Sequence, residues 1–107
     1  MSRFTLTIAG FLVVASAMTV THAAQRTVGQ KGKLFNPGAM TVKAGEIVLF
    51  QNDDTVTHHV YSSTKGQEFS IDTLMVGKSG SHTFSTKGRV DVRCGLHPGM
   101  RLVVTVQ

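Results

Sequence analysis

The stretch GRVDVRCGLHPGMRLVVTV, Gly88–Val106, decides the fold class of this chain. In its first seven residues apolar and charged side chains alternate, as they do along a half-buried β-strand. A second apolar run closes the stretch after a short loop. Val90, Val92 and Cys94 share one face of the first strand, and the charged residues between them share the other. Because charge marks the solvent side, we expect Cys94 to point inward at the end of a strand.

Short runs of the same kind, separated by turn signals, occupy the rest of the chain. The runs Ile47–Phe50 (IVLF) and Thr57–Ser62 (THHVYS) are rich in β-branched and aromatic residues, and Asn36–Gly38 (NPG) is a turn signal. No apolar period of 3.6 residues is long enough to indicate a helix. Runs of this type at intervals of about 8–12 residues predict an all-β sandwich or barrel.

The N-terminus has the pattern of a secretory signal. Arg3 precedes an apolar core, Ile8–Ala17, and the small residues around Ala23 suit a signal peptidase. The alternative, an uncleaved membrane anchor, is disfavoured because this core is shorter than the roughly 20 residues that span a bilayer. We therefore expect residues 1–23 to be removed as a signal peptide on export to the periplasm, with no stable membrane insertion afterwards. Residues 24–107 are expected to form one domain.

Cys94 is the single cysteine of the chain, so an exported form has no internal disulfide. His97 and Met100 follow it at steps of three residues, on one loop between two expected strands. A buried thiol by itself is usually a small core residue, and a lone histidine or methionine also usually packs. The combination on one loop favours a metal site, because a metal–thiolate bond protects the sulfur and cross-links a small domain.

A further histidine ligand is expected from the run THHVYS. His58 and Val60 share one face of this strand, whereas His59 and Tyr61 share the other. If Val60 belongs to the core, His58 points inward and joins Cys94. The opposite register, with His59 inward, stays open at this point, and we favour His58.

The donor set of His58, Cys94, His97 and Met100 distinguishes between metals. Zinc rarely takes a thioether as a ligand, and in structural sites it is usually held by four Cys or His ligands. Two imidazoles, one thiolate and a weak axial thioether form the ligand set of a mononuclear electron-transfer copper site. We therefore expect one type 1 copper ion that cycles between Cu(I) and Cu(II). Two alternatives stay open: a periplasmic copper carrier or storage protein with the same ligands, and an enzyme with Cys94 as its nucleophile.

Two stretches of the chain also carry a family resemblance. HTFSTKGRVDVRCGLHPGM, residues 82–100, resembles the C-terminal signature of the cupredoxins, the type 1 blue copper proteins, and is most similar to the amicyanins, plastocyanins and pseudoazurins. VKAGEIVLFQNDDTVTHHV, residues 42–60, resembles the family segment that carries the first histidine ligand. In the family this ligand lies six residues after an Asn, which corresponds here to Asn52 and His58.

The resemblance implies a cupredoxin-like Greek-key β-sandwich that carries one electron and is not an enzyme. It implies an apolar docking patch around the histidine of the cysteine loop, with Leu96 and Pro98 as members. Similarity to the amicyanins implies an amine dehydrogenase as electron donor and a c-type cytochrome as acceptor. The implied copper ligands are His58, Cys94, His97 and Met100.

The chain departs from the family pattern close to the expected site. His59 stands where the family commonly has an Asn that braces the two ligand loops. Its imidazole is expected either to make a similar hydrogen bond or to face solvent and titrate. Gly95 lacks the hydroxyl often found at its position, and Val90 and Val92 stand where aromatic residues are common. These changes leave the reduction potential open.

The formal net charge is +5, and the basic residues are scattered along the chain rather than grouped. This charge serves either solubility or attraction to an acidic protein partner. A nucleic-acid ligand is not expected, because no basic stripe is interleaved with aromatic residues. The protein is expected to be a monomer. Several other residues are expected to be structural: Asp53 and Asp54 in a turn, His82 in packing or at the surface, and Met40 and Met75 in the core or at its rim.

Overall fold

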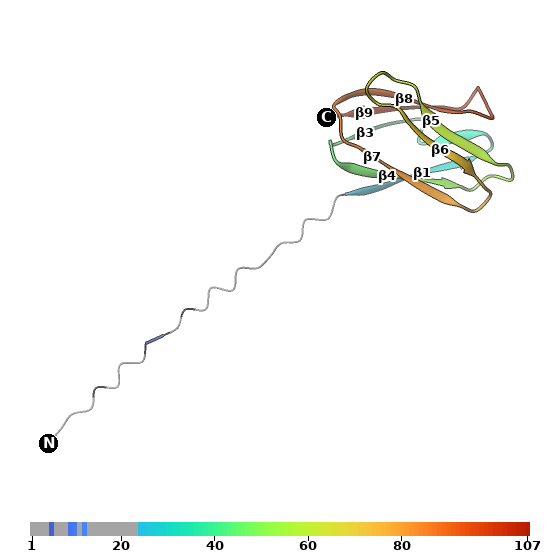
Figure 1. The fold of residues 1–107 in the computed structure, drawn as a ribbon. Coiled ribbons are helices and arrows are strands. Elements are labelled where there is room, and N and C mark those ends of the chain that lie inside the picture. Colours follow the sequence, from blue (N-terminus) through green and yellow to red (C-terminus); the bar gives the residue numbers. More distant parts are fainter. Residues whose placement is uncertain (1–4, 6–8, 11, 13–23) are drawn as a thin grey trace.

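The computed structural model describes residues 5, 9–10, 12 and 24–107, and Figure 1 shows the last of these ranges as a folded domain. Apart from four single positions, the expected signal peptide and its cleavage site lie outside the described residues. Signal cleavage therefore stays a prediction. In the described part of the chain, no helix has the length and apolar character needed to span a membrane.

The described domain consists of two β-sheets packed face to face (Figure 1). The four-stranded sheet has the order β2-β1-β4-β7, and the five-stranded sheet has the order β3-β9-β8-β5-β6. The all-β sandwich expected from the sequence is confirmed. The strands are β1 (Gln25–Lys31), β2 (Leu34–Asn36), β3 (Ala39–Val42), β4 (Glu46–Asn52), β5 (His58–Ser62), β6 (Phe69–Leu74), β7 (Ser79–Phe84), β8 (Gly88–Cys94) and β9 (Arg101–Val106).

The chain passes repeatedly between the two sheets, and this path brings β5 next to β8. Strands β1 and β4 are parallel, as are β3 and β9, whereas the other neighbouring strands are antiparallel. In the register between β5 and β8, Val60 lies opposite Cys94. His58 therefore starts its strand beside the end of the strand that carries Cys94.

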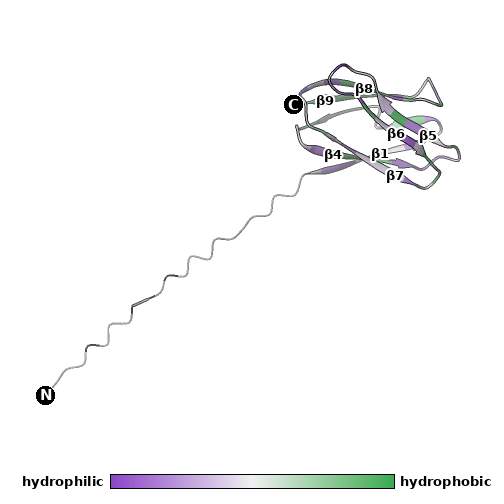
Figure 2. Ribbon diagram, in the orientation of Figure 1, coloured by the Kyte–Doolittle hydropathy of each residue, from purple (hydrophilic) through white to green (hydrophobic). Residues whose placement is uncertain are grey.

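Inward-facing side chains of both sheets fill the space between them, and hydrophilic and hydrophobic stretches alternate along the strands (Figure 2). Val90 and Val92 have no exposed surface and Cys94 is 2% exposed, so the inward face predicted for β8 is confirmed. On β5, His58 and Val60 are also fully buried. His58 is therefore the inward-facing histidine of the pair, as the alternation predicted.

His82 lies at the open side of the sandwich, where β7 and β6 meet. Its ring stacks on Phe69, with ring centroids 3.9 Å apart and planes 10° apart, and it meets the edge of Phe84 at 4.8 Å. His82 was expected in packing or at the surface, and the structure shows the packing role. Met40 is partly buried against the core, as expected. The same expectation is wrong for Met75, which is exposed in the loop after β6.

Burial of His82 makes the stability of the domain depend on pH. Desolvation lowers the pKa of His82 below its usual value of 6.5, because the charged ring loses hydration. The folded state therefore binds fewer protons, and this stabilisation is complete above pH 6.5 and is lost as the pH falls below it. His82→Phe keeps the stacking. When the pH is lowered from about 7 to about 5, we expect the Tm of this variant to fall less than the Tm of the wild type.

The His82 effect is expected to stay below about 1 kcal/mol because solvent screens a partly exposed group, which means a Tm difference below about 4–8 °C for a domain of this size. Differential scanning calorimetry at several pH values measures it. Equal slopes of Tm against pH for the two proteins would show that the His82 ring does not contribute.

Candidate metal centre

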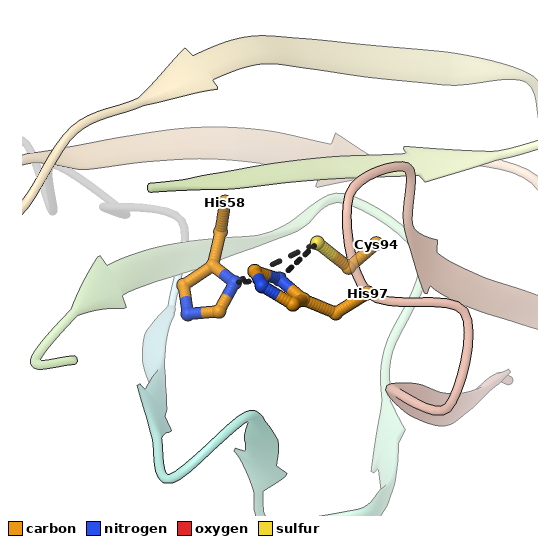
Figure 3. A group of neighbouring side chains, drawn as sticks. All are labelled: His58, Cys94 and His97. Carbon is orange, nitrogen blue, oxygen red and sulfur yellow. Dashed lines mark hydrogen bonds between the residues drawn. The ribbon is translucent and has the colours of Figure 1, made fainter. Parts of the chain in front are cut away.

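Three side chains with metal-binding atoms converge at one end of the sandwich (Figure 3). His58 is the first residue of β5, Cys94 is the last residue of β8, and His97 lies on the loop between β8 and β9. Their donor atoms all lie within 4.8 Å of one another. His58 and Cys94 are buried, and His97 is partly exposed. The structure thus brings together three of the four ligands predicted from the sequence.

The three donor atoms form a nearly equilateral triangle. The Nδ1 atoms of His58 and His97 are 3.2 Å apart, and each lies 3.6 Å from Cys94 Sγ. A point equidistant from the three atoms is about 2 Å from each, close to the metal–imidazole bond length of about 2.0–2.1 Å. The residues therefore fit a single ion held in a trigonal arrangement by two imidazoles and a thiolate.

Met100 ends the same loop and is 1% exposed. Its main-chain N–H donates a hydrogen bond to the carbonyl oxygen of His97 at 3.0 Å, which closes a β-turn. Pro98 and Gly99 occupy the two central positions, where their backbone preferences suit a turn. The short step from His97 to Met100 is thus one tight turn, and it leaves the thioether on the buried side of the loop.

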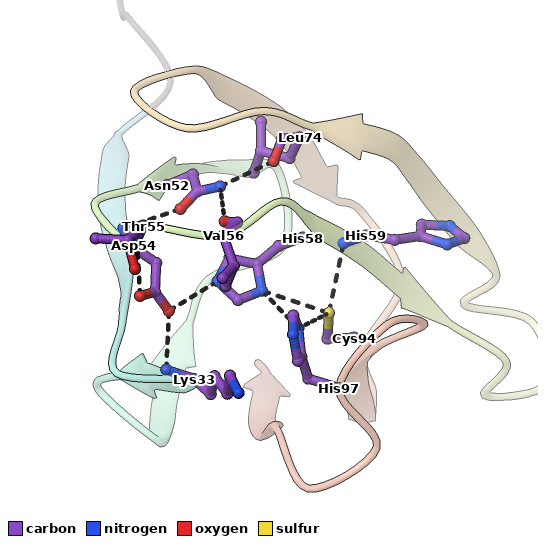
Figure 4. Close-up of polar contacts among 10 residues, drawn as sticks. All are labelled: Lys33, Asn52, Asp54, Thr55, Val56, His58, His59, Leu74, Cys94 and His97. Carbon is purple, nitrogen blue, oxygen red and sulfur yellow. Dashed lines mark hydrogen bonds and ion pairs between the residues drawn. The ribbon is translucent and has the colours of Figure 1, made fainter.

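Asp54 holds the ring of His58 from the side away from the donor triangle (Figure 4). Asp54 Oδ2 lies 3.1 Å from His58 Nε2, so this nitrogen donates its N–H and Nδ1 keeps its lone pair for a metal. Asp54 also accepts main-chain N–H bonds from Lys33 at 2.8 Å and Thr55 at 2.9 Å. These bonds, with that of Lys33 the strongest influence, lower the pKa of Asp54 to about 2.

The sequence predicts the turn position of Asp54 but not its contact with His58. The expected turn contact is present, because the Asp54 N–H donates to Asn52 Oδ1 at 2.9 Å. The contact with His58 is missed, since strand alternation gives no information about a side chain in a loop. An acidic residue four positions before a predicted histidine ligand is the one signal that the sequence offers for it.

Asn52 holds together the segment that leads to His58. Its fully buried side-chain amide donates to the carbonyl oxygens of Val56 and Leu74, both at 2.9 Å (Figure 4). These bonds fix the loop between β4 and β5 and attach it to the end of β6. The six-residue spacing from Asn52 to His58 is therefore the length of one loop closed by an asparagine.

The family described as copper binding proteins, plastocyanin/azurin family, matches residues 22–107. The chain belongs to this family. Copper is therefore the metal of the centre, and the cupredoxin resemblance is confirmed.

Solved structures of two cupredoxins and of one part of a copper enzyme share the fold. A purple cupredoxin from Nitrosopumilus maritimus is 26% identical, with a TM-score of 0.67, and the match covers 78% of this chain and 99% of that one. A reduced form of an amicyanin mutant is 25% identical, with a TM-score of 0.72, and the match covers 83% of this chain and 87% of that one. A copper-containing nitrite reductase from Thermus scotoductus is 24% identical, with a TM-score of 0.75, over 88% of this chain but 25% of that one. A search of curated proteins found no match.

His59, the departure from the cupredoxin pattern, does not brace the ligand loops with its side chain. The main chain does so instead: the Gly95 N–H donates to the His59 carbonyl oxygen at 2.9 Å. The His59 N–H also donates to Cys94 Sγ at 3.4 Å. The imidazole points to the outer face of the sheet, away from the donor triangle (Figure 4).

Apolar side chains are exposed next to the partly exposed His97. Leu96 is 56% exposed, and Pro98 is also exposed. Exposed apolar side chains grouped at one end are typical of an interaction surface. Leu96 and Pro98 flank His97 in the loop, where the resemblance implies docking.

Proposed function

We propose that this cupredoxin is a periplasmic one-electron carrier with a single type 1 copper ion held by His58, Cys94, His97 and Met100. The observation that carries the proposal is the triangle of two Nδ1 atoms and one sulfur, with sides of 3.2, 3.6 and 3.6 Å. When bound, copper supplies one-electron redox chemistry. Two imidazoles with a thiolate and an axial thioether form the donor set of blue copper sites.

The protein contributes rigidity to electron transfer. Asp54 fixes the His58 ring, the β-turn fixes His97 against Met100, and β8 fixes Cys94. Donor atoms that are already in place need little movement when the charge of the site changes, which favours fast electron exchange. Cys94 is 2% exposed, which supports a carrier over an enzyme that needs an accessible cysteine nucleophile.

The charges beside the ligand loop support an acidic redox partner. Arg93 and Arg101 lie directly opposite each other on β8 and β9, immediately before Cys94 and immediately after Met100. Neither forms an ion pair with a described residue. Like charges directly opposite each other are unfavourable, so carboxylates of a partner would be stabilised there. Similarity to amicyanin supports an amine dehydrogenase as donor and a c-type cytochrome as acceptor.

Copper(II) loading of the full domain tests the function. We expect an intense visible band from thiolate-to-copper charge transfer and a reversible one-electron wave in protein-film voltammetry. A colourless protein that binds only copper(I) would instead indicate a copper carrier or storage protein. Rapid alkylation of Cys94 in the metal-loaded protein would indicate an accessible nucleophile and contradict the proposal.

A further inference from the structure

His59 contacts the ligand Cys94 through its main chain, although its side chain is on the opposite face of β5. Its N–H donates to Cys94 Sγ at 3.4 Å, and its carbonyl oxygen accepts the Gly95 N–H at 2.9 Å. The position of residue 59 along the strand therefore decides how well this N–H points at the sulfur. Whatever holds His59 in place also holds this hydrogen bond.

The imidazole of His59 is tied to β6. Its Nε2 lies 2.7 Å from Ser70 Oγ and 2.7 Å from Asp72 Oδ1, and the Ser70 hydroxyl donates to the same Asp72 oxygen at 2.7 Å. The Ser70 hydroxyl donates its proton to Asp72. The Nε2–H of His59 is therefore the donor to both Ser70 Oγ and Asp72 Oδ1. These contacts form a closed network on the outer face of the sheet.

A β-bulge in β6 places Asp72 for this network. His58 lies opposite Leu74 and Val60 opposite Ile71, so two residues of β6 face the single residue His59. One of the two, Thr73, has a φ of 50°, which is uncommon for a β-branched residue. Bulges of this kind redirect a side chain and occur often beside functional sites. The bulge places the Asp72 carboxylate within reach of the His59 ring.

The opposite side of the His59 ring rests where Gly95 has no side chain. A Cβ atom at position 95 would lie 2.6 Å from Nδ1 of His59, closer than such atoms approach in real structures. The ring is thus held between the bulge of β6 and the residue that follows Cys94. Gly95 is a departure from the family pattern, and the His59 ring occupies the space that a side chain at this position would fill.

We propose that His59 is a positioning residue: its tethered imidazole fixes the main-chain N–H that donates to the Cys94 thiolate and thereby sets the reduction potential. A hydrogen bond to the sulfur withdraws electron density from the metal–thiolate bond and favours the reduced state. The inference rests on the proposed copper function, and it assigns the tuning to a side chain that does not touch the metal.

The double variant Ser70→Ala/Asp72→Ala tests the tether and leaves His59 and every proposed ligand in place. We expect the copper(II) protein to stay blue, with a shifted charge-transfer band and a lower reduction potential, because the N–H···S bond loosens. In zinc-substituted protein, the amide proton of His59 is expected to move upfield in the NMR spectrum for the same reason. The amide proton reports the hydrogen bond without any redox measurement.

Two controls separate this effect from charge and from the bulge itself. Glu68→Ala removes an exposed negative charge whose recorded contact is with the Gly66 N–H. Loss of a negative charge alone raises a reduction potential, the opposite of the change expected for the double variant. Thr73→Gly keeps the positive φ that the bulge needs, and its spectrum and potential are expected to match the wild type.

Gly95→Ala provides an independent variant should the double variant not fold. Its methyl group displaces the His59 ring while Ser70 and Asp72 remain, and it is expected to shift the amide proton and the potential in the same directions. If the double variant matches Glu68→Ala, and Gly95→Ala matches the wild type, in band, potential and amide shift, the side chain of His59 has no positioning role. A wild-type protein without a blue band would refute the copper function. The amide shift in the zinc protein would still show whether the tether of His59 positions its N–H.

Discussion

Cys94→Ser is expected to remove the intense visible band of the copper(II)-loaded protein completely. The band arises from charge transfer out of a thiolate, and a hydroxyl has no comparable orbital to donate from. The substitution removes the sulfur corner of the donor triangle, 3.6 Å from each imidazole nitrogen, and leaves two nitrogens and a thioether. Absorption and electron paramagnetic resonance spectra of the two proteins at equal copper content measure the loss.

Val92→Ala is the matched control for Cys94→Ser. Val92 lies two residues earlier on β8, shares the inward face and is fully buried, but it offers no donor atom. The alanine variant loses core packing and stability, yet it should keep the band because the triangle is intact. The chain has one cysteine, so a visible band that survives in Cys94→Ser would show that the band does not come from a copper–thiolate bond and would contradict the site assignment.

The strands and the donor set were predictable from the sequence because they depend on local alternation. Val90, Val92 and Cys94 alternate with charged residues, and a period of two places all three on the same face whatever the rest of the chain does. The same rule separates His58 from His59 once Val60 is assigned to the core. Convergence of Cys94 and His97 needed no tertiary information, because both lie on one short loop.

The supporting contacts were not predictable, because they join residues that the sequence separates. Asp54 is held by the main chain of Lys33, and this contact follows from the path of β1 and β2 rather than from any motif. The tether of His59 depends on a bulge at Thr73, and nothing in the residue types around it indicates one. Sequence reasoning therefore reached the proposed metal ligands and missed the contacts of Asp54 and His59.

His58→Ala is expected to damage the copper centre far more than His59→Ala, although the two histidines are adjacent. His58 supplies one corner of the donor triangle, and its loss also leaves the Asp54 carboxylate without its imidazole partner. Loss of an orienting residue typically costs about 10–100-fold in metal affinity, and loss of a ligand should cost more. We expect His58→Ala to lose the blue band and to bind copper more than about 100-fold more weakly.

His59→Ala removes only the ring on the outer face, and the main-chain N–H to Cys94 Sγ remains available. This variant is expected to stay blue, to bind copper within about tenfold of the wild type, and to shift its potential in the direction expected when the tether is cut. Competition titration against a copper chelator and voltammetry measure both quantities. A blue His58→Ala protein beside a colourless His59→Ala protein would mean that the ligand histidine is the other member of the pair. The complete burial of His58 and the 33% exposure of the His59 side chain argue against that outcome.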